Sequence, residues 1–528
     1  MRILFVLPNK DDFGFKPIGL ALLSGIARRI GWETKLFDTT EIDFGFMSDT
    51  KSREKAKVFK PVNLAFYGHI KKKINLQKHF IESINQFHPD CIAISVLSDE
   101  VLIASNITAI AKKFFPHIPI IWGGKYPTLQ PERTLLHYNA DFACIGEGIE
   151  AFNDFLNALS GKENIELYSI PNIWAKKETV VIKNSIRPLK QNLDDLPYVD
   201  WDLFTQPHFY KPFDGKVYKA GDHMLNWGCP HHCTYCINHF MHDTLYKGFP
   251  ILRRYSVRRI IDELKFLKTK YQLEFLKFHD EDFLMRPLGN LRELSETYRQ
   301  EVNLPFVIET NPKTVTREKV ELLKNMNCVS VSLGVETGDK QLRKKILKRA
   351  DSEEDIIHAF SLFKNASIRT TSFIMLGIPY ETRTTYETTI QLLKKADVQY
   401  PNAGFFFPFE GTLLRQVAID AGFFNPDNKQ EIIYTQDKPA LTSKELSEAE
   451  LIEMRDVFIL YVKLPKAYSP FIRRSETPDQ IGQKLRTKIL EIYDKTIFAH
   501  NGWYVNNGSE SIYLQQLQEI FNPITEKS

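Results

Sequence analysis

Cysteine is scarce in this sequence, with 6 residues in 528. So few cysteines exclude the disulfide framework of a small secreted domain. Long hydrophobic runs are also missing, because no stretch approaches the roughly 18 consecutive apolar residues that a membrane span needs. The apolar run at the start, residues 3–7, is too short for a secretory signal. We therefore expect a soluble protein of the reducing cytoplasm, without a transmembrane segment.

The sequence also has little excess of either charge. Its 69 Lys and Arg residues face 65 Asp and Glu residues, which leaves a net charge of +4. Such a small charge gives no reason to expect a nucleic-acid partner. Hydrophobic residues make up 43% of the chain, which is enough to bury the cores of about two to four domains.

Short apolar runs alternate with helical patterns in the first part of the chain. This alternation predicts an α/β domain over residues 1–165, with a doubly wound, Rossmann-like parallel sheet. Residues 43–89 carry runs of Lys and Arg and predict a solvated helical insertion or a crossover. The predicted strands cover residues 3–7, 33–38, 91–95, 118–122 and 142–144, and the predicted helices cover residues 18–30, 101–115 and 131–138.

A second alternation begins after a Pro-punctuated stretch, residues 166–215, which we interpret as a linker with a small hairpin. Six strand–helix units over residues 216–441 predict a partial, TIM-like (β/α)6 barrel. Residues 442–528 are helical in pattern and end in a polar tail at 525–528. The predicted barrel strands cover residues 223–227, 275–278, 306–309, 330–334, 372–376 and 404–407.

Half of all the cysteines lie within eight residues. Cys229, Cys233 and Cys236 have the spacing C-x3-C-x2-C. Thiolates are soft ligands, and three of them on one loop can hold three irons of a cubane cluster while the fourth iron stays open. An open iron requires a ligand from outside the protein.

A structural zinc site is the alternative for this loop, and it would make the protein a zinc-stabilised binding module without turnover. His231, His232 or His239 could then supply the fourth ligand. Zinc sites usually consist of two ligand pairs separated by a longer loop, and no second pair follows here. The spacing therefore favours iron.

The cysteine motif, with Tyr235 directly before the third cysteine, resembles the signature of the radical S-adenosylmethionine (SAM) superfamily. The resemblance implies a 4Fe-4S cluster bound by Cys229, Cys233 and Cys236, and SAM bound beside Tyr235. SAM then chelates the open iron through its amino and carboxylate groups. One electron from an external donor, such as flavodoxin or ferredoxin, cleaves it to a 5'-deoxyadenosyl radical.

Later segments resemble further SAM-binding stretches of this family, in the same order. Asp280 and Asp282 follow the second barrel strand and are expected to contact the methionine moiety, although acidic residues at this place are equally typical of a helix cap. Glu336 matches the carboxylate that binds the ribose. Gly377 would let the backbone approach the adenosine, and Phe407 would flank the adenine, with core packing as its alternative.

The N-terminal region resembles the cobalamin-binding domain that precedes many radical SAM proteins. Small residues at the ends of its predicted strands match the elements that hold the nucleotide tail of the corrinoid. One element is missing, because residues 9–20 contain no histidine to ligate cobalt. We expect cobalamin with a displaced tail and no protein histidine on the metal. The expected cobalamin contacts are Ser95, Leu97, Gly123, Gly124 and Gly146.

Together these resemblances predict an enzyme similar to the class B radical SAM methyltransferases, which methylates an unactivated carbon. A cobalamin-dependent cyclase or rearrangement enzyme is the alternative, because the motifs bind cofactors and do not specify the substrate. We expect a small-molecule or lipid-like substrate. The sequence identifies no residue that donates hydrogen or acts as a base.

Overall fold

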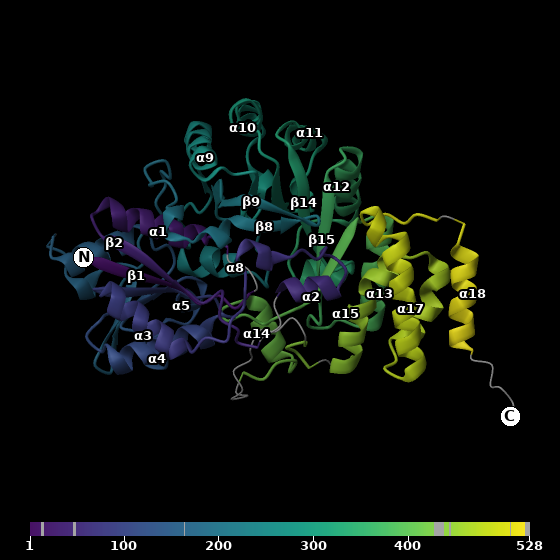
Figure 1. The fold of residues 1–528 in the computed structure, drawn as a ribbon, viewed down its shortest axis with the longest axis horizontal. Helices are drawn as coiled ribbons and strands as arrows, with labels where there is room; N and C mark the ends of the chain where they lie inside the picture. Colours follow the sequence, from purple (N-terminus) through teal and green to yellow (C-terminus); the bar gives the residue numbers. More distant parts are fainter. Residues whose placement is uncertain are drawn as a thin grey trace. The chain divides into compact units, whose positions relative to one another are not determined.

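The computed structural model describes residues 1–11, 15–45, 49–162, 164–426, 438–442, 445–506 and 508–522. The chain divides into two compact units (Figure 1). The first unit contains residues 1–50, 61–306 and 409–415, and the second contains residues 51–60, 307–408 and 416–528. The polar tail predicted at 525–528 lies outside the described residues.

The first unit begins with a seven-stranded sheet of order β2-β1-β3-β4-β5-β6-β7. The pairs from β2 to β5 are parallel, and β6 and β7 continue the sheet as an antiparallel hairpin. The hairpin expected in the linker therefore extends this sheet. The strands are β1 (Arg2–Leu7), β2 (Glu33–Asp38), β3 (Cys91–Ser95), β4 (Ile120–Gly123), β5 (Phe142–Cys144), β6 (Ile173–Lys177) and β7 (Val180–Ile182).

Helices cover both faces of this sheet, as the predicted doubly wound fold requires. In Figure 1, α1 (Ile18–Arg29) lies on one side of β1, whereas α3 (Leu76–Phe87) and α4 (Val101–Phe114) lie on the other. Helix α7 (Ile149–Ser160) packs beside α1. Two short helices follow β4, namely α5 (Lys125–Leu129) and α6 (Pro131–Leu136).

Helix α3 connects β2 to β3 as a crossover, which was one of the two alternatives expected for residues 43–89, and it is packed against the sheet rather than solvated. Phe80, Ile84 and Phe87 are buried in the same core as Ile92 and Ile94 of β3. Their spacing places them on one face of a helix. The Lys runs lie in the segments before α3, which contain α2 (Asp49–Lys55) and the 3-10 turn Leu64–Tyr67. Only part of this region is therefore peripheral.

The second sheet has the order β16-β15-β14-β13-β12-β9-β8 and confirms the six predicted parallel strands of a partial barrel. The prediction for residues 223–227 was wrong in its boundaries, because the first barrel strand ends at His223 and Asn226–Trp227 forms the separate strand β10 with β11 (Arg253–Arg254). In the first unit, β8 (Tyr210–Phe213) is antiparallel to β9 (Lys216–His223), which is parallel to β12 (Phe275–Phe278).

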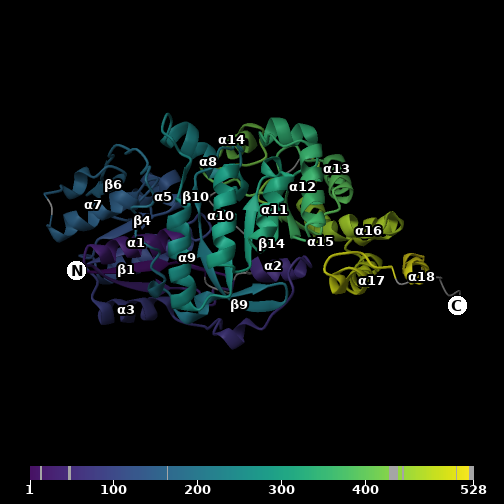
Figure 2. The same ribbon diagram turned by 90° about the horizontal axis from the view of Figure 1, so that it is seen from above.

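The other barrel strands lie largely in the second unit. They are β13 (Phe306–Thr310), β14 (Cys328–Glu336), β15 (Arg369–Leu376) and β16 (Tyr400–Phe405), and β15 is parallel to both β14 and β16. In the first unit α9 (Val257–Tyr271) and α10 (Leu288–Glu301) lie side by side, as Figure 2 shows. The helices of the second unit that follow its strands are α11 (Arg317–Asn325), the π-helical turn Leu342–Ile346, α12 (Glu353–Asn365), α13 (Arg383–Lys395) and α14 (Leu413–Asp420).

The C-terminal part of the second unit is helical, as predicted. Its helices are α15 (Glu448–Lys463), α16 (Ser469–Ser475), α17 (Gln480–Thr496) and α18 (Glu510–Phe521). Within the described ranges, no helix has the length and apolarity that a membrane crossing requires.

Candidate functional site: cysteine loop and neighbouring cavity

The three clustered cysteines lie on the loop between β10 and α8 (Ile237–Phe240). Gly228 opens this loop with φ +83, and a Cβ atom there would lie 2.3 Å from the carbonyl oxygen of Ile251. Only glycine fits such a close crossing of two backbones. At the other end the amide of Cys236 donates to the carbonyl of Cys233, at 3.1 Å, and Cys236 then leads into α8. The loop is therefore compact.

The cysteine side chains are shielded from solvent. Cys229 and Cys233 are buried, and Cys236 is half-buried. Burial raises the pKa of the Cys229 thiol to about 12 and that of the Cys236 thiol to about 11, and the Glu281 carboxylate adds to both shifts. Such thiols stay protonated at neutral pH, so a metal centre must displace their protons when it binds.

Asp280 fixes the backbone that leads into the cysteine loop. Its buried carboxylate accepts hydrogen bonds from the amide of Leu225, the amide of Asn226 at 2.6 Å and the side-chain amide of Asn226 at 2.7 Å. Burial raises the pKa of Asp280 to about 6, while these bonds oppose the shift. The sequence placed Asp280 correctly after β12, but the structure gives it a supporting role that the motif did not indicate. Its contact with SAM stays a prediction.

Asp282 also contacts the cysteine loop. It is fully buried, and its Oδ2 lies 2.8 Å from Nε2 of His231, the second residue after Cys229. Asp282 also directly precedes the 3-10 turn Phe283–Met285, but its side chain makes no capping hydrogen bond there, so the helix-cap alternative is not confirmed for this residue. Between the two aspartates, Glu281 lines a cavity beside the cysteines. From the sequence, His231 was expected only as an alternative zinc ligand, and Glu281 was not expected at the site, although both lie inside the motifs described above.

A cavity of about 470 Å³ lies between the first sheet and the cysteine loop, entirely within the first unit. Its walls contain all five residues predicted to contact cobalamin, together with Cys229. Apolar side chains such as Phe5, Ile94 and Phe152 form much of the remaining lining. The carboxyl ends of β3, β4 and β5 thus meet one ligand-sized space, which is where doubly wound sheets bind their ligands. The predicted residues on its wall are Ser95, Leu97, Gly123, Gly124 and Gly146.

At two positions in this wall the backbone conformation and the neighbouring atoms require glycine, whether or not a ligand is bound. Gly124 has φ +104, and a Cβ atom there would lie 2.8 Å from the carbonyl oxygen of Val96. Gly146 has φ +73, and its Cβ atom would lie 2.2 Å from the hydroxyl oxygen of Tyr246. Gly146 therefore makes room for a side chain that follows the cysteine loop. Whether it also faces cobalamin stays a prediction.

Tyr246 and Arg253 attach the segment after the cysteine loop to the first sheet. The amide of Glu147 donates to the Tyr246 hydroxyl at 2.7 Å, and the Glu147 carboxylate lies 2.8 Å from Nη1 of Arg253. Both partners of this ion pair are largely buried, and Arg253 opposes the rise in the pKa of Glu147 that burial causes. These contacts connect the cavity wall to the metal-binding loop.

A second buried contact connects the loop after β1 to β9. Lys16 is fully buried, and its Nζ lies 3.1 Å from Oδ2 of Asp222. Lys211 and His279 also approach Asp222, at 3.9 and 3.0 Å. Burial lowers the pKa of Lys16, whereas these neighbouring cations hold the pKa of Asp222 well below its usual range despite its burial. His279 is thus part of the network around Asp222.

The histidine that approaches the cavity does not come from the loop after β1. Among the described lining residues, His242 is the one histidine, and it follows α8. Its Nε2 contacts the carbonyl oxygen of Cys229.

Glu336 occupies the carboxyl end of β14 in the second unit. Its backbone has φ +65, which is unusual for a residue other than glycine, and a bulge separates it from Gly334. Oε1 of Glu336 lies 3.5 Å from Nη1 of Arg349, whose Nη2 donates to the carbonyl of Gly334 at 2.7 Å. Arg349 also binds Asp351 at 2.9 Å. The local structure therefore orients the carboxylate that the sequence assigned to the ribose.

Gly377 and Phe407 follow the next two strands, β15 and β16. Gly377 has φ +72, and its amide donates to Glu381 at 2.5 Å. Burial raises the pKa of Glu381 to about 8. Phe407 is half-buried just after β16. Because β14, β15 and β16 are parallel neighbours, Glu336, Gly377 and Phe407 lie at the same edge of the sheet.

Two family models match this chain. The B12 binding domain matches residues 12–156, and the radical SAM superfamily matches residues 227–393. The first match contains the sheet whose strand ends form the cavity wall. The second contains the cysteine loop, Asp280, Glu336 and Gly377. These matches support the iron–sulfur interpretation of the cysteines rather than the zinc-stabilised binding module.

The chain is also similar to named proteins along most of its length. An uncharacterized methyltransferase of Pyrococcus horikoshii is 25% identical over 514 residues, which cover 96% of each chain. The anaerobic magnesium-protoporphyrin IX monomethyl ester cyclase of Cereibacter sphaeroides is 23% identical over 474 residues, covering 86% of this chain and 69% of the relative.

A solved structure shares the fold. The radical SAM methyltransferase TsrM from Kitasatospora setae, with cobalamin and a 4Fe-4S cluster bound, superposes with a TM-score of 0.63 at 14% identity. The superposition covers 93% of this chain and 99% of TsrM. At this identity the likeness concerns the fold alone.

The residues of the two domains fit the cofactors that the domains imply. A radical SAM domain implies a 4Fe-4S cluster and SAM, and three shielded thiols on one compact loop suit such a cluster. A B12-binding domain implies cobalamin, and the cavity at its strand ends has glycines and apolar walls that suit a large flat ligand. The chain is therefore a radical SAM enzyme with a B12-binding domain.

Proposed function

We propose that this enzyme methylates an unactivated carbon atom of a small molecule. The observation that carries the proposal is the cavity of the first unit, whose wall combines the predicted cobalamin contacts with Cys229. A methyl carrier in this cavity would lie beside the loop of the cluster. The methyltransferase of Pyrococcus horikoshii, similar over nearly the whole chain, supports the same reaction class.

When bound, the cluster with SAM supplies radical chemistry and cobalamin supplies methyl transfer. The protein's own residues hold these groups and protect them. Cys229, Cys233 and Cys236 would ligate three irons, while Asp280 and Asp282 keep their loop in place. The apolar wall of the cavity excludes water, which prevents side reactions of reactive species.

Ring formation is the second candidate. The magnesium-protoporphyrin cyclase of Cereibacter sphaeroides is similar over 86% of this chain, nearly as much as the methyltransferase relative. The residues described above would hold the same cofactors for either reaction, so the fold does not separate the two.

The products of SAM separate the two candidates without knowledge of the substrate. The reconstituted enzyme is reduced anaerobically with titanium(III) citrate, with and without hydroxocobalamin, and its products are quantified by mass spectrometry. A methyltransferase should release S-adenosylhomocysteine in a cobalamin-dependent manner, because SAM that gives up its whole methyl group becomes S-adenosylhomocysteine. Formation of 5'-deoxyadenosine with no S-adenosylhomocysteine in the presence of cobalamin would contradict methyl transfer and favour the cyclase.

A further inference from the structure

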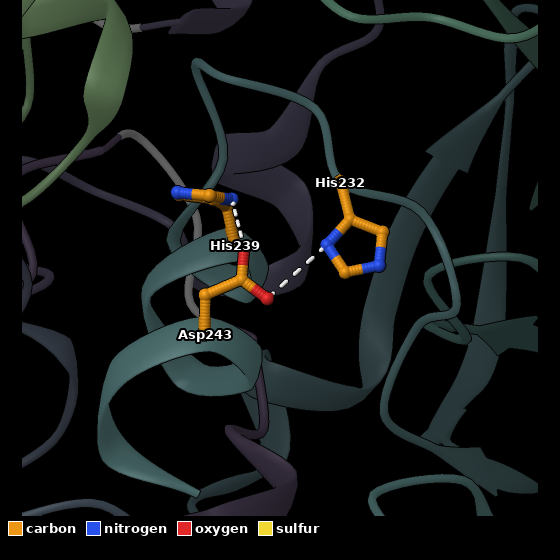
Figure 3. A group of neighbouring side chains, drawn as sticks. All are labelled: His232, His239 and Asp243. Carbon is orange, nitrogen blue, oxygen red and sulfur yellow. Dashed lines mark ion pairs between the residues drawn. The ribbon is translucent and has the colours of Figure 1, made fainter. Parts of the chain in front are cut away.

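Two histidines and one aspartate gather at the cysteine loop and the helical segment that follows it (Figure 3). Nδ1 of His239 lies 3.0 Å from Oδ2 of Asp243, and Nδ1 of His232 lies 3.4 Å from Oδ1 of the same carboxylate. The potential ligand atoms of the three residues all lie within 4.8 Å of one another. No cysteine is part of this group.

The local sequence explains the arrangement. His239 in α8 and Asp243 in the following π-helical turn (Met241–Leu245) are four residues apart, so both side chains project from one face of the helical segment. His232 comes from the loop between the first two cysteines. The hydrogen bonds from the amide of Cys236 to Cys233 and from the amide of His239 to Cys236 fold this loop back on the helix.

The three side chains are a suitable donor set for a divalent ion. Zinc binds imidazole nitrogen and carboxylate oxygen at about 2.0–2.2 Å, so neighbouring ligand atoms in a tetrahedral site are separated by about 3.3–3.6 Å. The separation of 3.4 Å between His232 and Asp243 falls within this range, that of 3.0 Å between His239 and Asp243 is slightly shorter, and all three ligand atoms lie within 4.8 Å of one another. Imidazole and carboxylate together select borderline ions such as Zn²⁺, Co²⁺ or Ni²⁺, whereas the iron–sulfur cluster requires thiolates.

We propose that His232, His239 and Asp243 bind one divalent ion of the zinc type at a site separate from the iron–sulfur cluster. The side chain of His239 is 13% exposed, while those of His232 and Asp243 are 53% and 45% exposed. Water therefore reaches the ion from the solvent side and completes its coordination. The ring of His242 lies 5.0 Å from that of His232, but its Nε2 contacts the carbonyl of Cys229.

The ion would connect the two ends of the cysteine loop. His232 directly precedes Cys233, whereas His239 and Asp243 follow Cys236. A metal bond between these segments restrains the loop that carries all three thiolates. The bound ion should therefore slow the loss of iron from the cluster to a chelator several-fold, by stabilising the loop in its closed form.

Zinc binding to the reconstituted holoenzyme tests the proposal. After equilibrium dialysis against micromolar zinc chloride, elemental analysis should find one zinc per chain in addition to the cluster iron. His239→Ala and Asp243→Asn should each weaken zinc binding at least tenfold, and His117→Ala, at an exposed turn, should leave it unchanged. Wild-type enzyme that retains no zinc would refute the proposal.

A second variant separates this site from zinc on empty thiols. The triple variant Cys229→Ala, Cys233→Ala, Cys236→Ala cannot hold the cluster but keeps His232, His239 and Asp243. Retention of one zinc per chain in this variant supports the proposed site. Loss of zinc from it would place the ion on the cysteines and overturn the proposal. If His239→Ala or Asp243→Asn loses iron together with zinc, the triple variant still shows whether zinc binds without the cluster.

Discussion

Replacement of Gly146 tests whether this glycine serves the docking of Tyr246 or the binding of cobalamin. Gly146 has φ +73, and an added Cβ would lie 2.2 Å from the Tyr246 hydroxyl oxygen and 2.9 Å from Cδ2 of Leu245. A left-handed backbone costs a non-glycine residue about 1–2 kcal/mol. Overpacking of a filled site adds about 1–3 kcal/mol. Gly146→Ala should therefore lower the free energy of unfolding by about 2–5 kcal/mol.

Gly161 supplies a matched control for the backbone contribution. It ends α7 with φ +63, and its added Cβ would meet nothing within 4 Å. Gly161→Ala should cost only the backbone strain of about 1–2 kcal/mol. Urea unfolding of both variants, followed by circular dichroism, measures the difference, which isolates the clash with Tyr246.

The measurement is made with and without cobalamin. An extra cost for Gly146→Ala of about 1–3 kcal/mol over Gly161→Ala in both conditions assigns the glycine to the packing of Tyr246. Equal costs for the two variants without cobalamin would refute this reasoning. In that case, if Gly146→Ala loses cobalamin on gel filtration and Gly161→Ala retains it, the role of Gly146 is to contact cobalamin.

Further predictions concern the metal loop and two buried charges. Cys233→Ala should lower iron from about four per chain to below one after anaerobic reconstitution, while Cys328→Ala, at a buried cysteine of β14, should keep its iron. Asp222→Asn should destabilise the protein by about 3–5 kcal/mol in urea unfolding, because Lys16 then stays buried without its carboxylate. Lys16→Met should cost less, since Lys211 and His279 also face Asp222; equal costs would contradict the network. Burial raises the pKa of Glu381 from 4.5 to about 8, so its contribution to stability is present below pH 4.5 and is lost as the pH rises to about 8. The stability of Glu381→Gln relative to wild type should therefore increase over this window, and a constant difference would contradict a buried protonated carboxyl.

Much of the fold followed from periodicity. The segments at residues 33–38, 91–95, 142–144 and 275–278 are strands with the predicted boundaries. For 91–95 and 142–144 the reason is that buried parallel strands are short and largely apolar, whereas 33–38 is a partly exposed edge strand. A helical insertion or crossover was expected over residues 43–89, but the burial of α3 was not, because the Lys-rich segments before it concealed the spacing of Phe80, Ile84 and Phe87. The strand predicted at residues 223–227 failed because an apolar run does not reveal where the chain turns from one partner strand to another.

The candidate site, like the fold, could be predicted from the sequence only in part. The spacing of three cysteines, the residue types that follow successive strands and the lack of a histidine at residues 9–20 are local properties, and they were sufficient to indicate the cofactors. The roles of Asp280, Tyr246 and Glu147 depend on contacts between residues 54 to 106 positions apart in the chain. No local pattern encodes such contacts, because the partner of a buried polar group is chosen by packing.

The sequence by itself therefore determined the chemistry that this protein can hold, since thiolate spacing and strand-end residues are set by the order of the chain. The tertiary structure alone decided that the predicted cobalamin contacts share a cavity with Cys229, and that two histidines and an aspartate meet beside the cysteine loop. The physical reason is that a ligand site is a property of distances in space. Those distances arise only when the buried strands and helices have packed.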